Sequence, residues 1–487
     1  MPASSSLPPP EKVVAPVQSG RLMGRIRSQA RRDQVICVAI AVILLAGIFL
    51  IQAPLRTRRS VLVVNHNKGV GDLIMTFPRL TLGGFRGILA MVIWENAEND
   101  KNNHDWVPLE TDYNAIAALE PYFGSAYIFN AWNQSYNLSA QFHDMNTKYK
   151  WVLDGLVYLY KGEKYVPDNA NMIMNEANDF FLKLGTSFER RYYTARWRYD
   201  LAHLYRYQPG KVNSQLSTLA EVYYIVHQPE FHIKLLPPRS SKGLLGHGVE
   251  VNGIHYRYGL SVFYFAYQEY ERALHTVPGP TDMGQQVLDS WPPMTLRCWC
   301  RDDLFYAQRL TNRIFNIDAE KKMLRRFPAR VENIEDCYRN IKINAPRSIN
   351  DFKKYLVKYP YQKYVHTQHI VEVQYYEILA KAEHELFNGL VAWQNNNRRF
   401  RLGDTADRDL ASAVTLYQQA IVAYRHYLNV AYPPEPNGMP NPSRKSQLKF
   451  LNALRVRIDG IQSFRLTAEH HQPNLSFLAP VTLSYSD

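Results

Sequence analysis

An uninterrupted apolar segment near the N-terminus constrains this chain more than any other feature. No charged residue occurs between Gln34 and Leu55, and residues 35–51 (VICVAIAVILLAGIFLI) are apolar throughout. A helix of about 22 residues, rising 1.5 Å per residue, crosses about 30 Å of hydrocarbon. A buried helix of a soluble domain would normally carry a polar stripe, which this segment lacks. Residues 34–55 are therefore predicted to form a single transmembrane helix.

A cleaved signal peptide is the alternative interpretation of the same segment. Signal peptides have a shorter apolar region and a shorter basic leader. Here a leader of 33 residues precedes the apolar segment, and Arg-Thr-Arg-Arg follows it at residues 56–59. Five arginines precede the segment and three follow it, so the positive-inside rule places the N-terminus in the cytoplasm. The bulk of the chain is then expected on the periplasmic or extracytoplasmic side of the membrane.

The net charge of +13 is concentrated around this segment. Residues 1–60 carry nine Lys and Arg against two acidic residues, so residues 61–487 carry only +6 of the net charge. A protein that binds nucleic acid concentrates positive charge in its folded part. The distribution therefore argues against a nucleic-acid partner, while the 46% of hydrophobic residues is enough for a sizeable core.

The cysteines and the glycosylation sequons are compatible with an extracytoplasmic location without establishing it. Cys298 or Cys300 bridges Cys337, or all three are buried free thiols, and the sequence leaves both options open. Asn-x-Ser sequons begin at Asn133, Asn137 and Asn474, and they matter only in a host that glycosylates.

Helical patterns dominate the soluble part of the chain. Short helices separated by short connections are typical of an antiparallel helical array. Residues 100–105 are polar and are predicted to form a loop. The predicted helices of the first region cover residues 85–99, 111–119, 125–138, 148–160, 170–184 and 192–207.

Three stretches resemble the tetratricopeptide repeat family, in which a proline ends one unit and a small residue and an aromatic open the next. In the first stretch, Leu119-Glu120-Pro121 is followed by Ser125-Ala126-Tyr127 and Ala131. In the second, residues 352–358 end at Tyr359-Pro360, and the helical pattern 371–386 follows. The third comprises residues 411–430, with Ala420 and Tyr424 four positions apart and Pro433 beyond them. The plan resembles membrane-anchored, tetratricopeptide-like proteins of bacterial envelopes, planctomycete ones among them. The repeats are degenerate, because Asn130 and Gln134 replace the usual leucine and aromatic. The resemblance implies a mainly α protein and names no activity.

Residues 208–295 are rich in proline and glycine and are predicted to interrupt the helical rhythm as an insertion. The segment 249–258 (VEVNGIHYRY) contains Asn-Gly between alternating runs, which favours a β-hairpin with a type I′ turn. In the expected register Val251 faces Ile254, Val249 faces Tyr256, and Glu250 faces His255.

No motif in the sequence predicts catalytic, metal-binding or cofactor-binding residues. His247, Glu250 and His255 lie close together, but a solvated cross-strand pair is the favoured interpretation. His384-Glu385 lacks the second histidine of a zincin, and Gly243, Gly246 and Gly248 lack the lysine of a phosphate loop. Asp302-Asp303 is predicted to begin a helix over residues 304–315, with the two carboxylates pointing in different directions. The basic runs with Arg325, Arg326 and Arg330 and at 395–401 are expected to be solvated helix ends.

Trp132 and Tyr136 are the candidate partner-binding residues, because they could line a peptide groove of the array, although a core position is the commoner role for such aromatics. The predicted function is a non-enzymatic, membrane-tethered scaffold that binds unknown protein partners, with no small-molecule substrate evident. The alternative is an envelope enzyme with a site between the array and the insertion.

The predicted segments are a disordered basic cytoplasmic tail (1–33), the transmembrane helix (34–55), a linker (56–84), helical repeats (85–207), the insertion with its hairpin (208–295), further helical repeats (296–468) and a tail (469–487).

Overall fold

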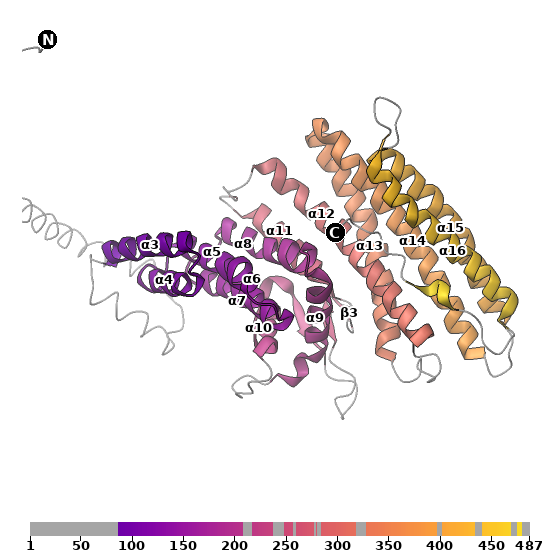
Figure 1. The fold of residues 1–487 in the computed structure, drawn as a ribbon, viewed down its shortest axis with the longest axis horizontal. Coiled ribbons are helices and arrows are strands. Elements are labelled where there is room, and N and C mark those ends of the chain that lie inside the picture. Colours follow the sequence, from indigo (N-terminus) through magenta and orange to yellow (C-terminus); the bar gives the residue numbers. More distant parts are fainter. Residues whose placement is uncertain are drawn as a thin grey trace, which may run out of the picture. The chain divides into compact units, whose positions relative to one another are not determined.

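The computed structural model of the chain describes residues 86–207, 217–236, 248–256, 260–276, 279, 284–317, 328–396, 402–433, 441–468 and 475–479. These residues are mainly helical, as predicted, with one small antiparallel sheet (Figure 1). They belong to two compact units, one holding residues 86–96 with 118–120 and the other residues 97–117 with those from 121 onward. In the first unit Arg86 forms an ion pair with Glu120 at 3.1 Å.

The described part of the chain begins with a succession of mostly short helices. They are α3 (Arg86–Asn103), α4 (Trp106–Leu119), α5 (Gly124–Trp132), η2 (Asn133–Leu138), α6 (Ser139–Gln141), α7 (Met145–Glu163), α8 (Ala170–Asn178), η3 (Asp179–Thr186), α9 (Arg190–His203) and η4 (Leu204–Arg206). N-terminal capping determines where two of these helices begin. The side chains of Asp144 and Asn169 accept hydrogen bonds from backbone N–H groups in the first turns of α7 and α8. The predicted loop at 100–105 is largely wrong, since α3 continues to Asn103 and the chain turns at His104, whose φ is +62°.

The prediction that residues 208–295 interrupt the helical rhythm is wrong over much of its length. This stretch contains α10 (Ser217–Val226), η6 (Pro229–Phe231), β1 (Ile233–Leu235), β2 (Val249–Val251), β3 (Ile254–Tyr256) and α11 (Val262–His275). The faces of α10 and α11 bury large apolar side chains in the same core as α7 and α9. The stretch is therefore part of the helical domain and not an appendage to it.

The predicted hairpin is confirmed residue by residue. Val249 pairs with Tyr256, Glu250 with His255, and Val251 with Ile254. Asn252 and Gly253 have φ values of +49° and +78°, as a type I′ turn requires. A third strand was not predicted: β1 pairs antiparallel with β2 and completes a sheet of order β1-β2-β3.

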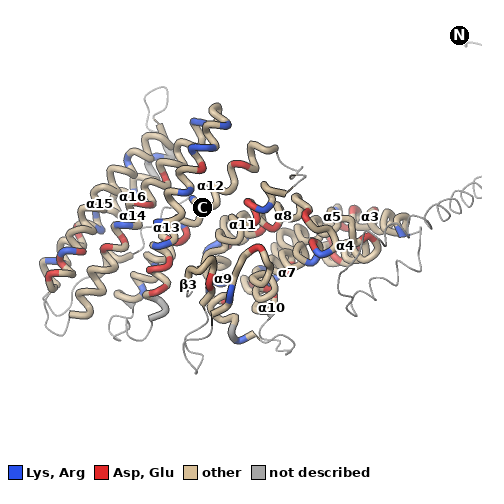
Figure 2. The backbone as a smooth tube through the Cα atoms, turned by 180° about the vertical axis from the view of Figure 1, so that it is seen from behind, with Lys and Arg blue, Asp and Glu red and all other residues tan. Residues whose placement is uncertain are grey.

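Long helices make up the remainder. They are α12 (Gln285–Asn312) with the π-helical turn η7 (Arg313–Ile317), α13 (Pro328–Lys358), η10 (Pro360–Gln362), α14 (Lys363–Asn396), α15 (Asp404–Ala431), α16 (Pro442–Thr467) and η12 (Ser476–Leu478). Each of the helices from α12 to α16 packs against the next one along the chain, and Figures 1 and 2 show α13 to α16 side by side. The second part of the chain is thus a layer of successive helices.

Two local predictions in this part are corrected. Pro292 and Pro293 belong to the proline-rich stretch 208–295 that was predicted to interrupt the helices. They lie inside α12, although prolines there remove two helical hydrogen bonds. Burial of Leu288 and Leu296 on either side of them outweighs that local preference. The predicted C-terminal tail contributes Phe477 and Leu478 to the core, so residues 475–479 belong to the folded domain.

The described residues form two large hydrophobic clusters and a smaller one that includes Tyr127 and Leu159, and α12 contributes to both large clusters. Leu288, Leu296 and Trp299 belong to the cluster of the first part, whereas Leu304 and Ala307 belong to the cluster of α13 to α16. Cys298, Cys300 and Cys337 are free, buried thiols, which is one of the two options left open by the sequence.

No described helix is long and apolar enough to cross a membrane. The predicted transmembrane segment 34–55, the tail 1–33 and the linker 56–84 all lie outside the described residues.

Gly155 of α7 allows a close approach between α7 and the end of α5. A Cβ atom at this position would lie 2.3 Å from Ser135 Oγ and 2.9 Å from the backbone oxygen of Ala131. Gly155→Val is expected to lower the free energy of unfolding by about 1–3 kcal/mol, because overpacking forces backbone shifts. Urea denaturation measures the change. Gly87→Ala is the control, because the nearest atom to an added Cβ there is 3.9 Å away, and an equal loss in both variants would contradict the interpretation.

Candidate functional site

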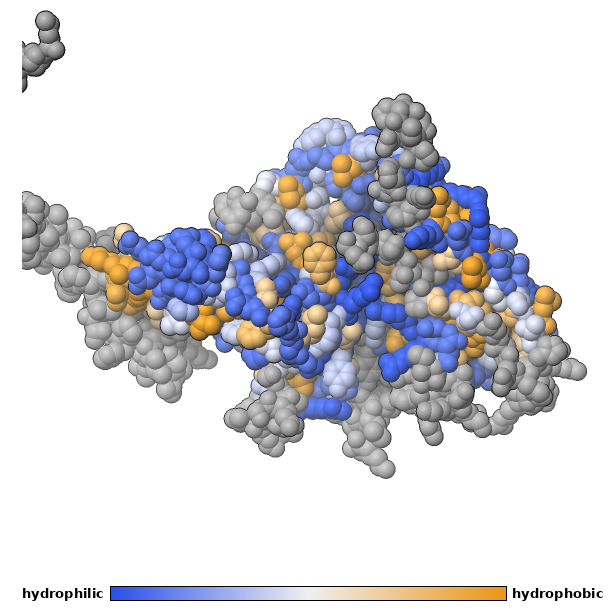
Figure 3. Space-filling view, viewed as in Figure 1, coloured by the Kyte–Doolittle hydropathy of each residue, from blue (hydrophilic) through white to orange (hydrophobic). Residues whose placement is uncertain are grey.

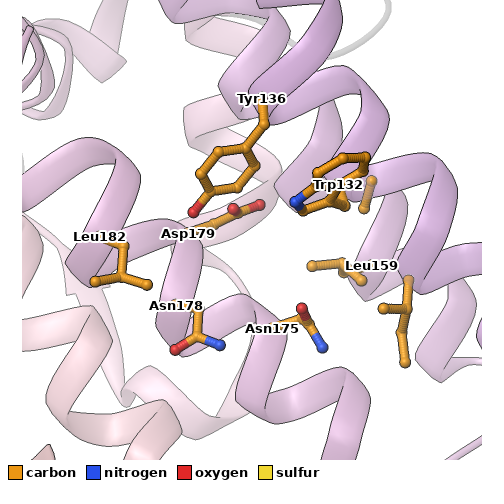
Figure 4. A pocket seen from close by; sticks show the side chains of 9 residues that line it. Trp132, Tyr136, Leu159, Asn175, Asn178, Asp179 and Leu182 are labelled. Carbon is orange, nitrogen blue, oxygen red and sulfur yellow. The ribbon is translucent and has the colours of Figure 1, made fainter. Parts of the chain in front are cut away.

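A small pocket lies between α5, α7 and α8 in the first part of the chain (Figure 4). Its volume is about 240 Å³. We call it the aromatic pocket, and it is lined by Ile128, Ala131, Trp132, Tyr136, Leu159, Asn175, Asn178, Asp179 and Leu182. Typical small-molecule sites measure about 300–1,000 Å³. The aromatic pocket is therefore suited to a single side chain and not to a larger ligand.

Two π-helical turns frame the aromatic pocket. η2 continues α5, and η3 continues α8. The Ser135 hydroxyl in η2 donates a hydrogen bond of 2.8 Å to Asp179 Oδ2, the first residue of η3, and so joins the two turns. π-Helical turns are rare and occur frequently at functional sites. Their coincidence at one pocket marks this place as a candidate site.

Trp132 and Tyr136, the predicted partner-binding residues, both line the aromatic pocket. They are four residues apart on the continuous helix, and their rings stack with centroids 6.2 Å apart and an interplanar angle of 20°. Trp132 is 44% exposed and Tyr136 is half-buried. Neither ring is enclosed in the core, so both can contact a partner. That role stays a prediction.

Asp179 is a buried acidic residue that the sequence analysis missed. It is 4% exposed, and burial raises the pKa of its carboxyl to about 7, against the effects of the Ser135 hydrogen bond and the Lys183 charge. Among the described residues, no ion pair within 4.0 Å includes Asp179. The Lys183 ammonium lies 5.0 Å above the Tyr136 ring instead.

Two asparagines supply further polar groups. Asn178 Oδ1 accepts a hydrogen bond of 2.9 Å from the Tyr270 hydroxyl of α11, which orients the amide. Asn175 donates to the Asn171 carbonyl at 2.7 Å and keeps its own Oδ1 as an acceptor. The polar residues Asn171, Asn175, Asn178 and Asp179 recur at helical spacing between the apolar runs 172–174 and 180–182. That spacing was the sequence signal that could have revealed this face.

A second polar group, largely buried, was also not predicted. The Arg272 cluster consists of Arg272 with Glu163, Glu176, Glu230 and Glu269, contributed by α7, α8, η6 and α11. The guanidinium donates to Glu269 at 2.7 Å, to Glu176 at 2.7 Å and to Glu163 at 3.0 Å, and Glu230 lies 3.8 Å away.

Burial dominates the electrostatics of the Arg272 cluster. Glu176 and Glu269 are fully buried. Burial and the neighbouring carboxylates raise the pKa of Glu176, and burial raises that of Glu269 to about 8. Four carboxyl groups around one cation cannot all ionise at low energetic cost. Glu269 therefore retains its proton in the folded state at neutral pH.

The prediction for Asp302-Asp303 is wrong. Both residues lie in the middle of α12, and both accept hydrogen bonds of 2.6 Å from Arg198 of α9. Arg198 is 2% exposed and also lies 4.3 Å from the centre of the Tyr306 ring. Adjacent carboxylates converge here because one guanidinium lies between them.

The remaining predicted groups contribute no site. His255 pairs with Glu250 at 2.8 Å on an exposed face of the hairpin, and His384 pairs with Glu335 at 3.0 Å. Within the described part of the chain, no three His, Cys, Asp or Glu side chains are arranged to hold a metal ion.

Asn133 of the first sequon is buried and donates to the Trp106 carbonyl, so this fold leaves it inaccessible to glycosylation. His247, Gly243, Gly246, Arg325, Arg326, residues 397–401 and Asn474 lie outside the described residues.

Comparison with known proteins finds no matching family, no matching curated protein and no matching solved structure.

Proposed function

We propose that this chain is a membrane-tethered, tetratricopeptide-like scaffold that binds protein partners in the cell envelope, and that the aromatic pocket is one contact point. The observation that carries the proposal is the stacked, accessible pair Trp132 and Tyr136 beside a pocket of single-side-chain size. Large aromatic residues are enriched at protein interfaces, where one side chain often enters a pocket.

The helical packing supports the repeat interpretation. Ala126 and Ala131 are buried, and the Tyr127 ring packs beside Tyr158 at 5.4 Å between centroids. Ala420 and Tyr424 are likewise buried, with the Tyr424 ring 4.7 Å from that of Phe450. Small residues that allow close helix approach and aromatics that fill the remaining space are what the family resemblance leads one to expect.

The surface is consistent with protein binding. Lys and Arg are interspersed with Asp and Glu along the described helices (Figure 2). On the face shown in Figure 3, hydrophobic residues form small groups among hydrophilic ones. A mixed surface with an accessible aromatic is typical of partner-binding proteins, whereas a nucleic-acid interface requires concentrated positive charge.

One observation favours the enzyme alternative. The Arg272 cluster joins helices of the predicted array to α11 and η6 of the predicted insertion, and burial raises the pKa values of Glu163, Glu176 and Glu269. Such groups occur at catalytic sites. However, the Arg272 guanidinium occupies the centre of the cluster and binds three of the carboxylates directly. The scaffold proposal is therefore the better supported of the two.

Photo-crosslinking in native membranes tests the scaffold proposal. Benzoylphenylalanine at position 132 of the full-length chain is expected to capture one discrete protein, and the same probe in place of Phe188 is not. Phe188 is the matched control because it is an aromatic residue that is 91% exposed on the same part of the chain.

Trp132→Ala is expected to weaken capture and co-purification of that protein by about tenfold or more, the loss typical of an aromatic anchor. Phe188→Ala is expected to leave both unchanged. Equal capture from positions 132 and 188, or no loss in Trp132→Ala, would contradict the assignment of the aromatic pocket as a contact.

A further inference from the structure

Asp179 gives the aromatic pocket a specific charge requirement. Its carboxyl group is buried beside the space that a partner would occupy, and it receives one hydrogen bond from Ser135. The Lys183 ammonium is directed to the Tyr136 ring, and among the described residues no cation pairs with Asp179 within 4.0 Å. The Lys183 ammonium offsets the charge of the buried carboxyl from beyond 4.0 Å. A ligand cation in direct contact with Asp179 would therefore gain further energy here.

The other lining groups select the shape of that ligand. Ile128, Leu159 and Leu182 form an apolar wall, while Trp132 and Tyr136 present aromatic rings. Asn175 Oδ1 remains an acceptor. The pocket therefore combines a negative group, a second acceptor, ring faces and an apolar wall within about 240 Å³.

We propose that the aromatic pocket receives an arginine side chain of the protein partner, with its guanidinium paired to Asp179 and its methylene stem against the apolar wall. This inference rests on the proposed scaffold function and adds the chemistry of the partner. Arginine fits better than lysine because a planar guanidinium stacks on aromatic rings, has five donors for several acceptors and is more weakly hydrated than an ammonium.

Titration with four short peptides tests this inference. The probes are acetylated and amidated pentapeptides, Gly-Ala-X-Ala-Gly, in which X is arginine, lysine, citrulline or norleucine. The readout is the ¹⁹F spectrum of the full-length chain labelled with fluorotryptophan in mild detergent, with the Trp132 signal assigned from Trp132→Phe. The arginine peptide is expected to shift this signal with the highest affinity. Citrulline, a neutral isostere of arginine, is expected to bind at least tenfold more weakly.

Asp179→Asn provides the matched variant. Asparagine has nearly the same shape and still accepts the Ser135 hydrogen bond, and Asp179 forms no ion pair with another described residue, so the fold is expected to persist. In this variant the arginine and citrulline peptides are expected to bind equally weakly. Melting temperature and circular dichroism verify that the variant is folded.

The outcomes separate the inference from the proposed function. Equal affinity for arginine and citrulline in the unaltered chain would overturn the charge requirement, and equal affinity for lysine would overturn the assignment to arginine. If no peptide shifts the Trp132 signal while position 132 still crosslinks a partner in membranes, this inference fails and the scaffold proposal stands. If both experiments are negative, both proposals fail.

Discussion

Arg272→Met is expected to lower the free energy of unfolding by about 3–5 kcal/mol, the typical loss when one partner of a buried ion pair is removed. The variant leaves Glu176 and Glu269 fully buried without the cation that binds both of them. Methionine retains the apolar stem, so the loss reports the charge and not the packing. Urea denaturation followed by circular dichroism measures the change.

The loss in Arg272→Met is expected to grow as the pH rises. Burial raises the pKa of Glu269 from 4.5 to about 8, so the folded chain retains a proton that the unfolded chain releases near pH 4.5. The stability associated with that protonated carboxyl is complete below about pH 4.5 and is lost as the pH rises to about 8. Without Arg272 the carboxyl groups must stay protonated to remain buried, and this becomes more costly at pH 8 than at pH 5.

Two controls test that explanation. Lys381→Met makes the same charge change at a side chain that is 56% exposed, and its unfolding free energy is expected to change by less than about 0.5 kcal/mol. Adding Glu176→Gln and Glu269→Gln to Arg272→Met is expected to restore part of the stability. A loss of the same size at pH 5 and pH 8 would refute the role assigned to the Arg272 cluster.

Arg198→Met is the second variant with a large expected effect, again about 3–5 kcal/mol in unfolding free energy. Arg198 is buried, binds both Asp302 and Asp303 of α12, and is contributed by α9. Asn340 of α13 donates to the second oxygen of Asp303 at 2.9 Å, and the α11 cap Ser261 donates to Asp302 at 2.8 Å. Removing the guanidinium therefore weakens the packing of α9, α11, α12 and α13 where these four helices contact one another.

Hydrogen exchange locates this effect. Faster exchange is expected at α9 and in the middle of α12 together, because both depend on the same guanidinium. Arg408→Met, at an arginine whose side chain is 76% exposed, is the control and is expected to change neither stability nor exchange. A change confined to α9 would show that Arg198 does not join the two elements. Combining Arg198→Met with Asp302→Asn and Asp303→Asn should recover stability, because the unpaired charges are removed as well.

The correct sequence predictions concern features that neighbouring residues determine. Asn252-Gly253 specified the turn of the hairpin, and the alternation on each side specified its register. Helical periodicity located most helices of the first part within a few residues. The predictions at Pro292-Pro293 and at residues 100–105 are wrong because burial and helix continuation outweighed local preferences.

Trp132 and Tyr136 could be selected from the sequence because their four-residue spacing places them on one helix face, but the pocket beside them could not. The Ser135–Asp179 bond joins residues 44 positions apart, and the bond from the Tyr160 hydroxyl to Glu269 of the Arg272 cluster joins residues 109 positions apart. Nothing local in the sequence distinguishes these carboxylates from solvated ones.

The sequence by itself determined the helical class, the hairpin and the apolar segment at residues 34–55, because these follow from periodicity, turn chemistry and hydrophobic length within short windows. Tertiary structure alone decided where the acidic residues lie: Asp302 and Asp303 on Arg198, four glutamates around Arg272, and Asp179 beside Trp132. The physical reason is that the ionisation of a carboxyl group depends on its burial and on the cations around it. Both are set by helices that are distant in the chain and meet only in the folded core.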